Sequence, residues 1–148
     1  MTLAPNLQTY QNKEPLVFET KGRATFSDLD PYGHVNNTHY FSYFMAHRFE
    51  AMRIYLGWDL MTIHKLPIAF FIKKTEIEYI RPLLFDHEYT IQSYISELSS
   101  SSAHLTMDMK DDQGHIIAAC QVVLVCIDKK TQKPCSWPEE VISKFYNI

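Results

Sequence analysis

Hydrophobic side chains recur at two different spacings along this chain, and the longest helical pattern begins near residue 38. Between Thr38 and Leu56 the apolar residues return every three or four positions, and polar residues fall largely between them. That spacing is typical of an amphipathic helix. Asn36, Asn37 or Thr38 can cap its first turn. Gly57 can end it, so the pattern predicts one helix of about five turns.

Alternating apolar and polar residues predict strands on both sides of that helix. Their ranges are residues 16–26, 66–80, 88–98, 103–110 and 115–128. The last range is almost continuously apolar, so we expect this strand to be central and covered on both faces. Turn residues separate the later strands, which is typical of an antiparallel sheet. With the long helix and a short final helix opened by Pro138, these strands predict an α+β domain.

The length and charge of the chain fit a single domain. Its 148 residues are enough for a hydrophobic core without disulfide bonds. Residues 1–15 are polar and end at Pro15, so we expect a flexible arm followed by one domain over residues 16–148. The formal net charge is −3 and no basic block stands out, which argues against nucleic acid as a partner.

Cysteine use and hydropathy favour a cytoplasmic protein without a membrane span. Cys120, Cys126 and Cys135 form no C-x-x-C pair, and their odd number argues against a disulfide framework. The first fifteen residues lack the apolar and basic segments of a secretory signal. No apolar run approaches the length of a membrane-spanning helix.

Residues able to act on a carbonyl group gather just before the predicted helix. Asp28 and Asp30 precede a proline–glycine turn, and His34, Asn36 and Asn37 follow its proline. The first N–H groups of a helix have no helical partner and can bind negative charge. A carboxylate beside such amides suits attack on a carbonyl carbon. Each residue also has a structural interpretation, because such side chains bond turns, cap helices or satisfy backbone carbonyls.

The aromatic residues at the start of the helix have two interpretations as well. Tyr40, Tyr43 and Phe44 are of the kind most often found in a core, but beside a ligand tunnel one or two can line it. Other chemistries lack their motifs, since the chain has no G-x-S-x-G elbow, no phosphate loop and no H-E-x-x-H pair. We therefore expect neither a metal nor an organic cofactor.

A ten-residue signature runs through the segment before the helix. It reads Asp28-Leu29-Asp30-Pro31-Tyr32-Gly33-His34-Val35-Asn36-Asn37 and is followed by Tyr40 and Tyr43. This run resembles the signature of the 4-hydroxybenzoyl-CoA thioesterase-like acyl-CoA thioesterases, which have the hot-dog fold. The resemblance implies an antiparallel sheet of about five strands wrapped around one long helix. It also implies hydrolysis of an acyl-CoA thioester to a free acid and CoA.

The same resemblance implies roles for single residues and for the assembly. Asp30 is implied as the catalytic carboxylate, either nucleophile or general base on water, and Asp28 is the less favoured candidate. The candidates for polarising or orienting the carbonyl, besides the helix amides, are His34, Asn36 and Asn37. The pocket candidates are Tyr40, Tyr43 and Phe44. Proteins of this family form dimers whose sheets join edge to edge, so we expect a homodimer or a tetramer of dimers with acyl sites at the subunit boundary.

Two positions in the helix depart from the family pattern. Many relatives continue with Tyr-x-x-Tyr-x-Glu-x-Ala-Arg, where this chain has Met45 for the Glu, His47 for the Ala and a matching Arg48. The loss of that carboxylate favours a fatty acyl group over a polar aromatic one.

Two other functions stay open at this point. The first is hydrolysis of thioesters on an acidic acyl carrier protein, which would need a basic docking patch from Lys73, Lys74 and Arg81. The second is a non-catalytic module of the same fold that binds acyl-CoA without turning it over.

Overall fold

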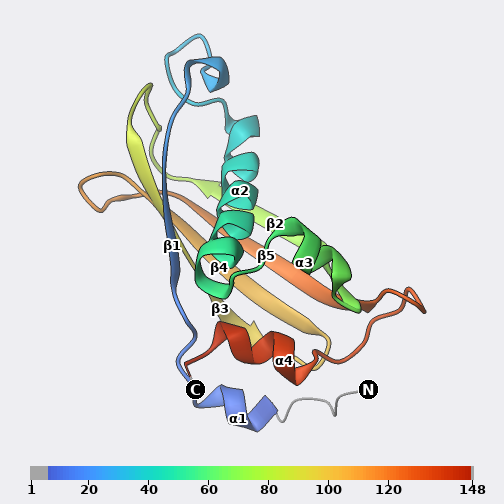
Figure 1. Cartoon of the computed structure of the whole chain (residues 1–148). Coiled ribbons are helices and arrows are strands. Elements are labelled where there is room, and N and C mark those ends of the chain that lie inside the picture. The colour runs from blue at the N-terminus through green and yellow to red at the C-terminus, as the bar shows by residue number, and fades with distance from the viewer. Residues whose placement is uncertain (1–6, 148) are drawn as a thin grey trace.

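The computed structural model describes residues 7–147 and shows one long helix lying across a twisted sheet (Figure 1). The helices are α1 (Leu7–Gln11), α2 (Asn37–Leu56), α3 (Leu60–Lys65) and α4 (Glu139–Ile142). The strands are β1 (Phe18–Arg23), β2 (Ile68–Tyr79), β3 (Glu88–Leu98), β4 (Ser102–Lys110) and β5 (Ile116–Asp128). Single 3-10 turns occupy Phe26–Asp28 and Ser143–Phe145. The α+β class predicted from the sequence is confirmed.

The five strands form one antiparallel sheet in the order β1-β3-β4-β5-β2. Strands β3, β4 and β5 follow one another through short turns and are therefore neighbours. Strand β2 pairs with β5 at one edge of the sheet, and β1 forms the opposite edge. Strands β1 and β2 are consecutive in the sequence, but three other strands lie between them in the sheet. This sheet, wrapped around α2, is the hot-dog arrangement (Figure 1).

The core lies between α2 and the face of the sheet that is turned toward it. Successive strand residues point to opposite faces, so every second residue of a strand contributes. The buried side chains of β5 on this face are Ala118, Cys120, Val122, Leu124 and Cys126. They form one buried cluster with Tyr40 and Phe44 of α2, and Trp137 and Ile142 of the C-terminal segment belong to the same cluster. This packing fixes where α2 begins relative to the strand ends.

Local sequence explains the two ends of α2. The Oδ1 of Asn36 accepts hydrogen bonds from the backbone N (3.0 Å) and the Oγ1 (2.9 Å) of Thr38. At the other end Gly57 has a φ of +69°, from which its N–H donates to the Arg53 carbonyl at 3.1 Å. The helix thus begins one residue before the predicted Thr38 and ends at the predicted Leu56.

The structure differs from the sequence predictions at the N-terminus and after α2. The predicted flexible arm lies partly outside the described residues, but from Leu7 onward it forms α1. There Tyr10 is buried, and its ring lies 5.0 Å from that of Tyr146. The stretch expected to be a connector after α2 contains α3, whose first turn is capped by Asp59. Neither stretch shows hydrophobic periodicity. The buried Tyr10 holds α1 in place, and the Asp59 cap stabilises α3.

Strand β5 also differs from its prediction. It is flanked on both sides, but β4 is the central strand. The face of β5 that points away from α2 carries Ala119, Gln121, Val123 and Val125 and is only partly covered. Its apolar run was therefore not a sign of two covered faces, because an antiparallel sheet can expose small and β-branched residues on one side.

Three further properties bear on function. Among residues 7–147, no helix combines the length and the apolar content that a bilayer crossing requires. The same part of the chain holds no group of three or more side chains placed to bind a metal ion. All three cysteines are free thiols.

Candidate active site

Asp30 lies in a tight turn that its own carboxylate holds together. Its Oδ1 accepts hydrogen bonds from the backbone N of Tyr32 (2.8 Å) and of His34 (3.2 Å). The backbone closes the same turn, since Asp30 N donates to His34 O (2.7 Å) and Gly33 N donates to Asp30 O (3.1 Å). Gly33 has a φ of +78°, which glycine adopts without strain. One carboxylate oxygen thus belongs to the turn, while Oδ2 takes part in neither of its two bonds.

The first residue of α2 presents its backbone amide beside this turn. The backbone amide of Thr38 already donates to the Asn36 side chain, and His39 N donates to Asn36 O at 2.9 Å. The amide of Asn37 lies at the first helical position, where a helix offers no partner of its own. The partial positive charge of a helix N-terminus adds to the attraction of that amide for an anion. This end of α2 is therefore suited to bind a negatively charged oxygen.

A pocket of about 230 Å³ brings these groups together. One side of it consists of Asp30, His34, Val35, Asn37 and Tyr40. The other side is the end of β2 and the residues just after it: Tyr79, Ile80, Arg81 and Pro82. Four of the seven site residues predicted from the sequence thus share one space, although they come from a turn and a helix.

Five residues that line this pocket were not predicted as site residues, and two of them, Tyr79 and Arg81, have polar side chains. The Tyr79 hydroxyl donates to the Asn37 carbonyl at 3.0 Å, and its ring meets that of Tyr40 edge-on, with centroids 5.1 Å apart. Arg81 is exposed at the rim of the pocket. The sequence did signal that a strand ends at Arg81-Pro82. Nothing in local spacing could show that this strand end lies opposite the mouth of α2, because tertiary packing decides that contact.

The other three predicted residues do not line the pocket. The side chain of Asn36 is used as the helix cap. Phe44 is completely buried in the core. The ring of Tyr43 stacks on that of Tyr89 at a centroid distance of 5.3 Å, and its hydroxyl donates to Asp28. Their positions match the structural interpretation that the sequence left open for each.

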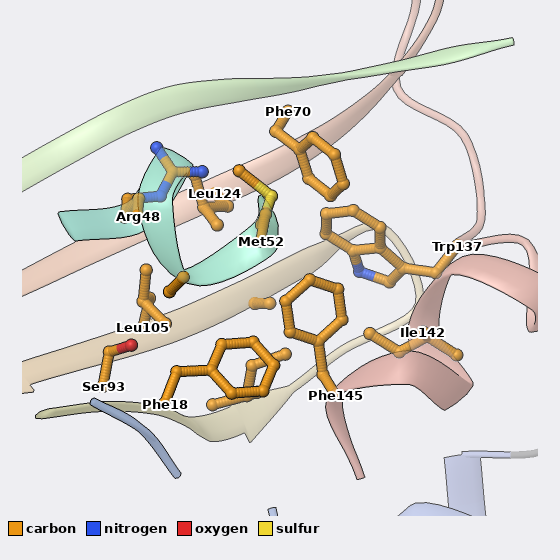
Figure 2. Close-up of a pocket in the computed structure, with 13 residues that line it drawn as sticks. Phe18, Arg48, Met52, Phe70, Ser93, Leu105, Leu124, Trp137, Ile142 and Phe145 are labelled. Atoms are coloured by element: carbon orange, nitrogen blue, oxygen red, sulfur yellow. The ribbon is translucent and has the colours of Figure 1, made fainter. Parts of the chain in front are cut away.

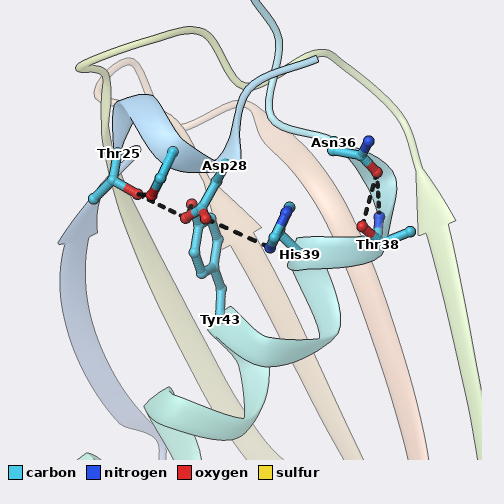
Figure 3. A network of polar contacts seen from close by, with 7 residues as sticks. Thr25, Asp28, Asn36, Thr38, His39 and Tyr43 are labelled. Atoms are coloured by element: carbon cyan, nitrogen blue, oxygen red, sulfur yellow. Dashed lines mark hydrogen bonds and ion pairs between the residues drawn. The ribbon is translucent and has the colours of Figure 1, made fainter.

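Asp28 is the centre of a separate polar network, which Figure 3 shows. Its Oδ2 accepts hydrogen bonds from the Tyr43 hydroxyl and from Thr25 Oγ1 (2.7 Å), and its Oδ1 lies 3.5 Å from His39 Nδ1. These contacts hold the pKa of Asp28 below its ordinary value, and the hydrogen bond from Tyr43 contributes most. Its backbone carbonyl accepts from Asn36 N at 2.8 Å. Both carboxylate oxygens are thus engaged in bracing the helix cap.

A second cavity lies between the C-terminal half of α2 and the sheet (Figure 2). It has a volume of about 40 Å³, and aromatic rings of Phe18, Phe70, Trp137 and Phe145 form much of its wall. Arg48 of its lining stands eleven residues after Asn37, which is about 16 Å along the helix. Within residues 7–147, no carboxylate lines this cavity. The groups able to attack a carbonyl are therefore at the other end of α2.

Comparisons with known proteins agree with the motif. Residues 24–145 match the model of the thioesterase-like superfamily. Long-chain acyl-CoA thioesterase FadM of Escherichia coli K12 is 32% identical over 117 residues, which are 78% of this chain and 87% of FadM. Acyl-CoA thioester hydrolase YbgC of Escherichia coli O6:H1 is 23% identical over 129 residues, or 87% of this chain and 96% of YbgC.

Solved structures share the architecture. The crystal structure of YbaW from Escherichia coli has a TM-score of 0.76 at 27% identity and covers 86% of this chain and 95% of its own. A Staphylococcus aureus protein solved in complex with CoA has a TM-score of 0.78 at 18% identity, covering 88% of this chain and 82% of its own, and shows the fold alone. The sheet wrapped around α2, with a carboxylate at the helix mouth, defines a hot-dog domain. The chain belongs to the thioesterase-like superfamily, whose model spans most of its length.

Proposed function

We propose that this protein hydrolyses acyl-CoA thioesters to a free acid and CoA, with Asp30 as the reacting carboxylate. The observation that supports this most directly is one pocket that contains both Asp30 and the amide end of α2. The names of FadM and YbgC, which describe acyl-CoA thioester hydrolases, support the same reaction.

The chemistry follows from the two oxygens of Asp30. Its Oδ1 is held by two turn amides, so the carboxylate has a fixed orientation and Oδ2 is the oxygen left for the substrate. Oδ2 either attacks the thioester carbon itself or removes a proton from an attacking water molecule. In both cases the carbonyl oxygen gains negative charge, which the Asn37 amide stabilises. A donor of this kind is typically worth roughly 3–4 kcal/mol in the transition state.

Neighbouring side chains have supporting roles in this proposal. His34 lines the pocket beside Asp30 and orients the thioester, while Asn36 acts indirectly by holding the first turn of α2. The exposed guanidinium of Arg81 at the rim suits the phosphate groups of CoA.

For the acyl group we propose a fatty chain. Met45 stands where many relatives carry a glutamate, so no carboxylate is present there to bind a polar acyl group. FadM, which is 32% identical, is named for long-chain acyl-CoA.

We further propose that two chains pair through β2, with a tetramer of dimers as the larger alternative. Strand β2 is twelve residues long and leaves Phe71 60% exposed and Tyr79 45% exposed at the edge of the sheet. The opposite edge, β1, has only six residues. Since β2 ends in the wall of the Asp30 pocket, a second chain on this edge would lie beside the site. The unpaired N–H and C=O groups along a long edge strand are a template for pairing with another chain.

The experiment that tests the reaction is Asp30→Asn, assayed by release of free thiol from a panel of acyl-CoAs of increasing chain length. An asparagine Oδ1 can still accept both turn hydrogen bonds, so the turn and the melting temperature should be retained. Without the charge, kcat should fall about 1000-fold. Asp28→Asn is the matched control, and it should change stability more than it changes kcat.

The alternatives predict other results for the same proteins. Near-normal turnover by folded Asp30→Asn would remove Asp30 from the mechanism. A non-catalytic module would bind acyl-CoA tightly and release no thiol even with Asp30 intact. Faster hydrolysis of a matched acyl-carrier-protein thioester would favour the carrier protein as substrate.

A further inference from the structure

Two free thiols face each other where the C-terminal segment passes the end of β5. The Sγ atoms of Cys126 and Cys135 are 3.5 Å apart. Backbone bonds hold both residues in place, since Cys135 N donates to Cys126 O at 2.9 Å and Ile127 pairs with Pro134. The third cysteine, Cys120, lies six residues earlier on β5, roughly 20 Å along the strand. Of the three cysteines, only Cys126 and Cys135 are therefore close enough to react directly with each other.

We propose that Cys126 and Cys135 are an oxidation site, at which a small disulfide such as oxidised glutathione converts the two thiols into one intramolecular disulfide bond. The bond requires sulfur atoms about 2.05 Å apart, so the two Sγ atoms must approach by about 1.5 Å. Side-chain rotation can supply that movement while the backbone stays paired. The site is separate from the proposed hydrolytic pocket and makes no use of Asp30.

The different burial of the two thiols sets the order of the reaction. Cys135 is half-buried and Cys126 is buried, so the reagent meets Cys135 first. The Cys135 thiolate attacks one sulfur of oxidised glutathione, whose disulfide breaks and releases one glutathione. Cys126 then gives up its proton and attacks Cys135 Sγ, which releases the second glutathione. The protein loses two electrons and two protons, and oxidised glutathione gains them. Burial raises the pKa of the Cys126 thiol, which lowers its thiolate fraction and makes the second step the slower one.

The new bond would tie the C-terminal segment to the sheet. Cys135 lies two residues before Trp137, whose backbone N donates to Ser100 O (3.0 Å) and whose Nε1 donates to Ser102 O (3.1 Å). Trp137 forms one wall of the apolar cavity (Figure 2). A disulfide across residues 126–135 limits the freedom of the unfolded chain and the local opening of this wall. Oxidation therefore stabilises the region around the cavity.

The test is treatment of the native protein with oxidised glutathione, followed by intact mass measurement and non-reducing peptide mapping. We expect the loss of two hydrogen atoms, a crosslink between the peptides of Cys126 and Cys135, and reversal by dithiothreitol. Cys120 should stay free for alkylation after denaturation. The melting temperature of the oxidised protein should rise by roughly 5 °C.

Single variants separate the two steps. Cys126→Ser should stop after the first step and carry one glutathionyl group on Cys135. Cys120→Ser should form the internal bond as the original protein does, because Cys120 takes no part. The proposal is overturned if the original protein keeps glutathione on Cys135 without closing the bond, if the crosslink joins two chains, or if no thiol reacts.

Discussion

At the scale of single residues, His47 is the buried polar group with the clearest dependence on pH. It is 3% exposed, and its two ring nitrogens lie 2.7 Å from Thr20 Oγ1 and 2.7 Å from Ser93 Oγ. A neutral imidazole donates through one nitrogen and accepts through the other, so both bonds can form without charge. Burial, with the charge of Arg48 beside it, lowers the pKa of His47 to about 4. The neutral residue ties α2 to β1 and β3, and burial makes its protonation unfavourable.

His47 should therefore make stability fall in mild acid. The unfolded chain binds a proton on this histidine near pH 6.5 and the folded chain only near pH 4, so protonation between these values favours unfolding. The stability due to neutral His47 is complete above pH 6.5, and about 3 kcal/mol of it is lost by pH 4. Urea unfolding of His47→Gln, which keeps a donor and an acceptor, should lose that part of the pH dependence. The same replacement of exposed His64 should keep it, and equal slopes for the original protein and His47→Gln would contradict the assignment.

The residues of the candidate site differ in how far sequence could predict them. Asp30, His34 and Asn37 lie within eight positions, so one turn and one helix cap bring them together and local reasoning suffices. Tyr79 and Arg81 reach the same pocket from the end of a strand some forty residues later. Their position depends on how α2 lies across the sheet, which no local pattern encodes. The partners of His47 on β1 and β3 escaped prediction for the same reason.

At the scale of elements, the proposed mechanism makes the first turn of α2 important for both stability and catalysis. Asn36→Ala removes the cap and should lower the free energy of unfolding by about 1 kcal/mol. Since the uncapped turn no longer fixes the Asn37 amide, kcat for acyl-CoA should fall as well, about tenfold. Urea unfolding and a thiol-release assay measure the two effects.

The chain contains a matched control for this prediction in α3. Asp59 caps that helix through bonds to the N and Oγ1 of Thr62, both 2.8 Å long, so each cap holds a threonine of the first turn, two residues on for Asn36 and three for Asp59. Asp59→Ala should lower the urea midpoint and leave kcat unchanged, because α3 does not line the pocket. If both variants slowed turnover equally, the amide of Asn37 would have no special role.

Elements with strong periodicity were predictable, and short or ambiguous ones were not. The range of β3 matches its prediction residue for residue, and α2 differs by a single residue at its start. Six-residue α3 is too short to show a helical period. The apolar run of β5 could not reveal the position of this strand in the sheet, because a strand that is covered on one face only can also be apolar throughout.

At the scale of the whole molecule, the edge of β2 sets the geometry of the proposed dimer. An antiparallel pairing about a two-fold axis at Thr75 would place Lys74 opposite the partner's Glu76, on the part of β2 that follows its irregularity between Ile72 and Lys74. Opposite-charge pairs across strands stabilise a sheet, whereas like charges directly opposite destabilise it. The charged residues of β2 are thus complementary to those of a second copy in this register.

A charge exchange on β2 tests that register. Lys74→Glu should weaken dimerisation about tenfold, because the introduced carboxylate of each chain would then face the partner's Glu76. Adding Glu76→Lys to the same chain restores opposite charges and should restore the dimer. Sedimentation velocity over a range of protein concentrations measures both. A double variant that stays as weak as the single one would exclude this register, and a monomer at all concentrations would exclude the dimer.

The hydroxyl of Tyr79 belongs to the exposed edge and to the pocket at once, since it donates to the first carbonyl of α2. In the proposed dimer the partner's strand would lie beside this tyrosine, so a chain that loses its partner on strong dilution would lose that neighbour. Turnover per chain should then decline while circular dichroism still reports a folded protein. The abundance of the protein would in that way govern how active each copy is.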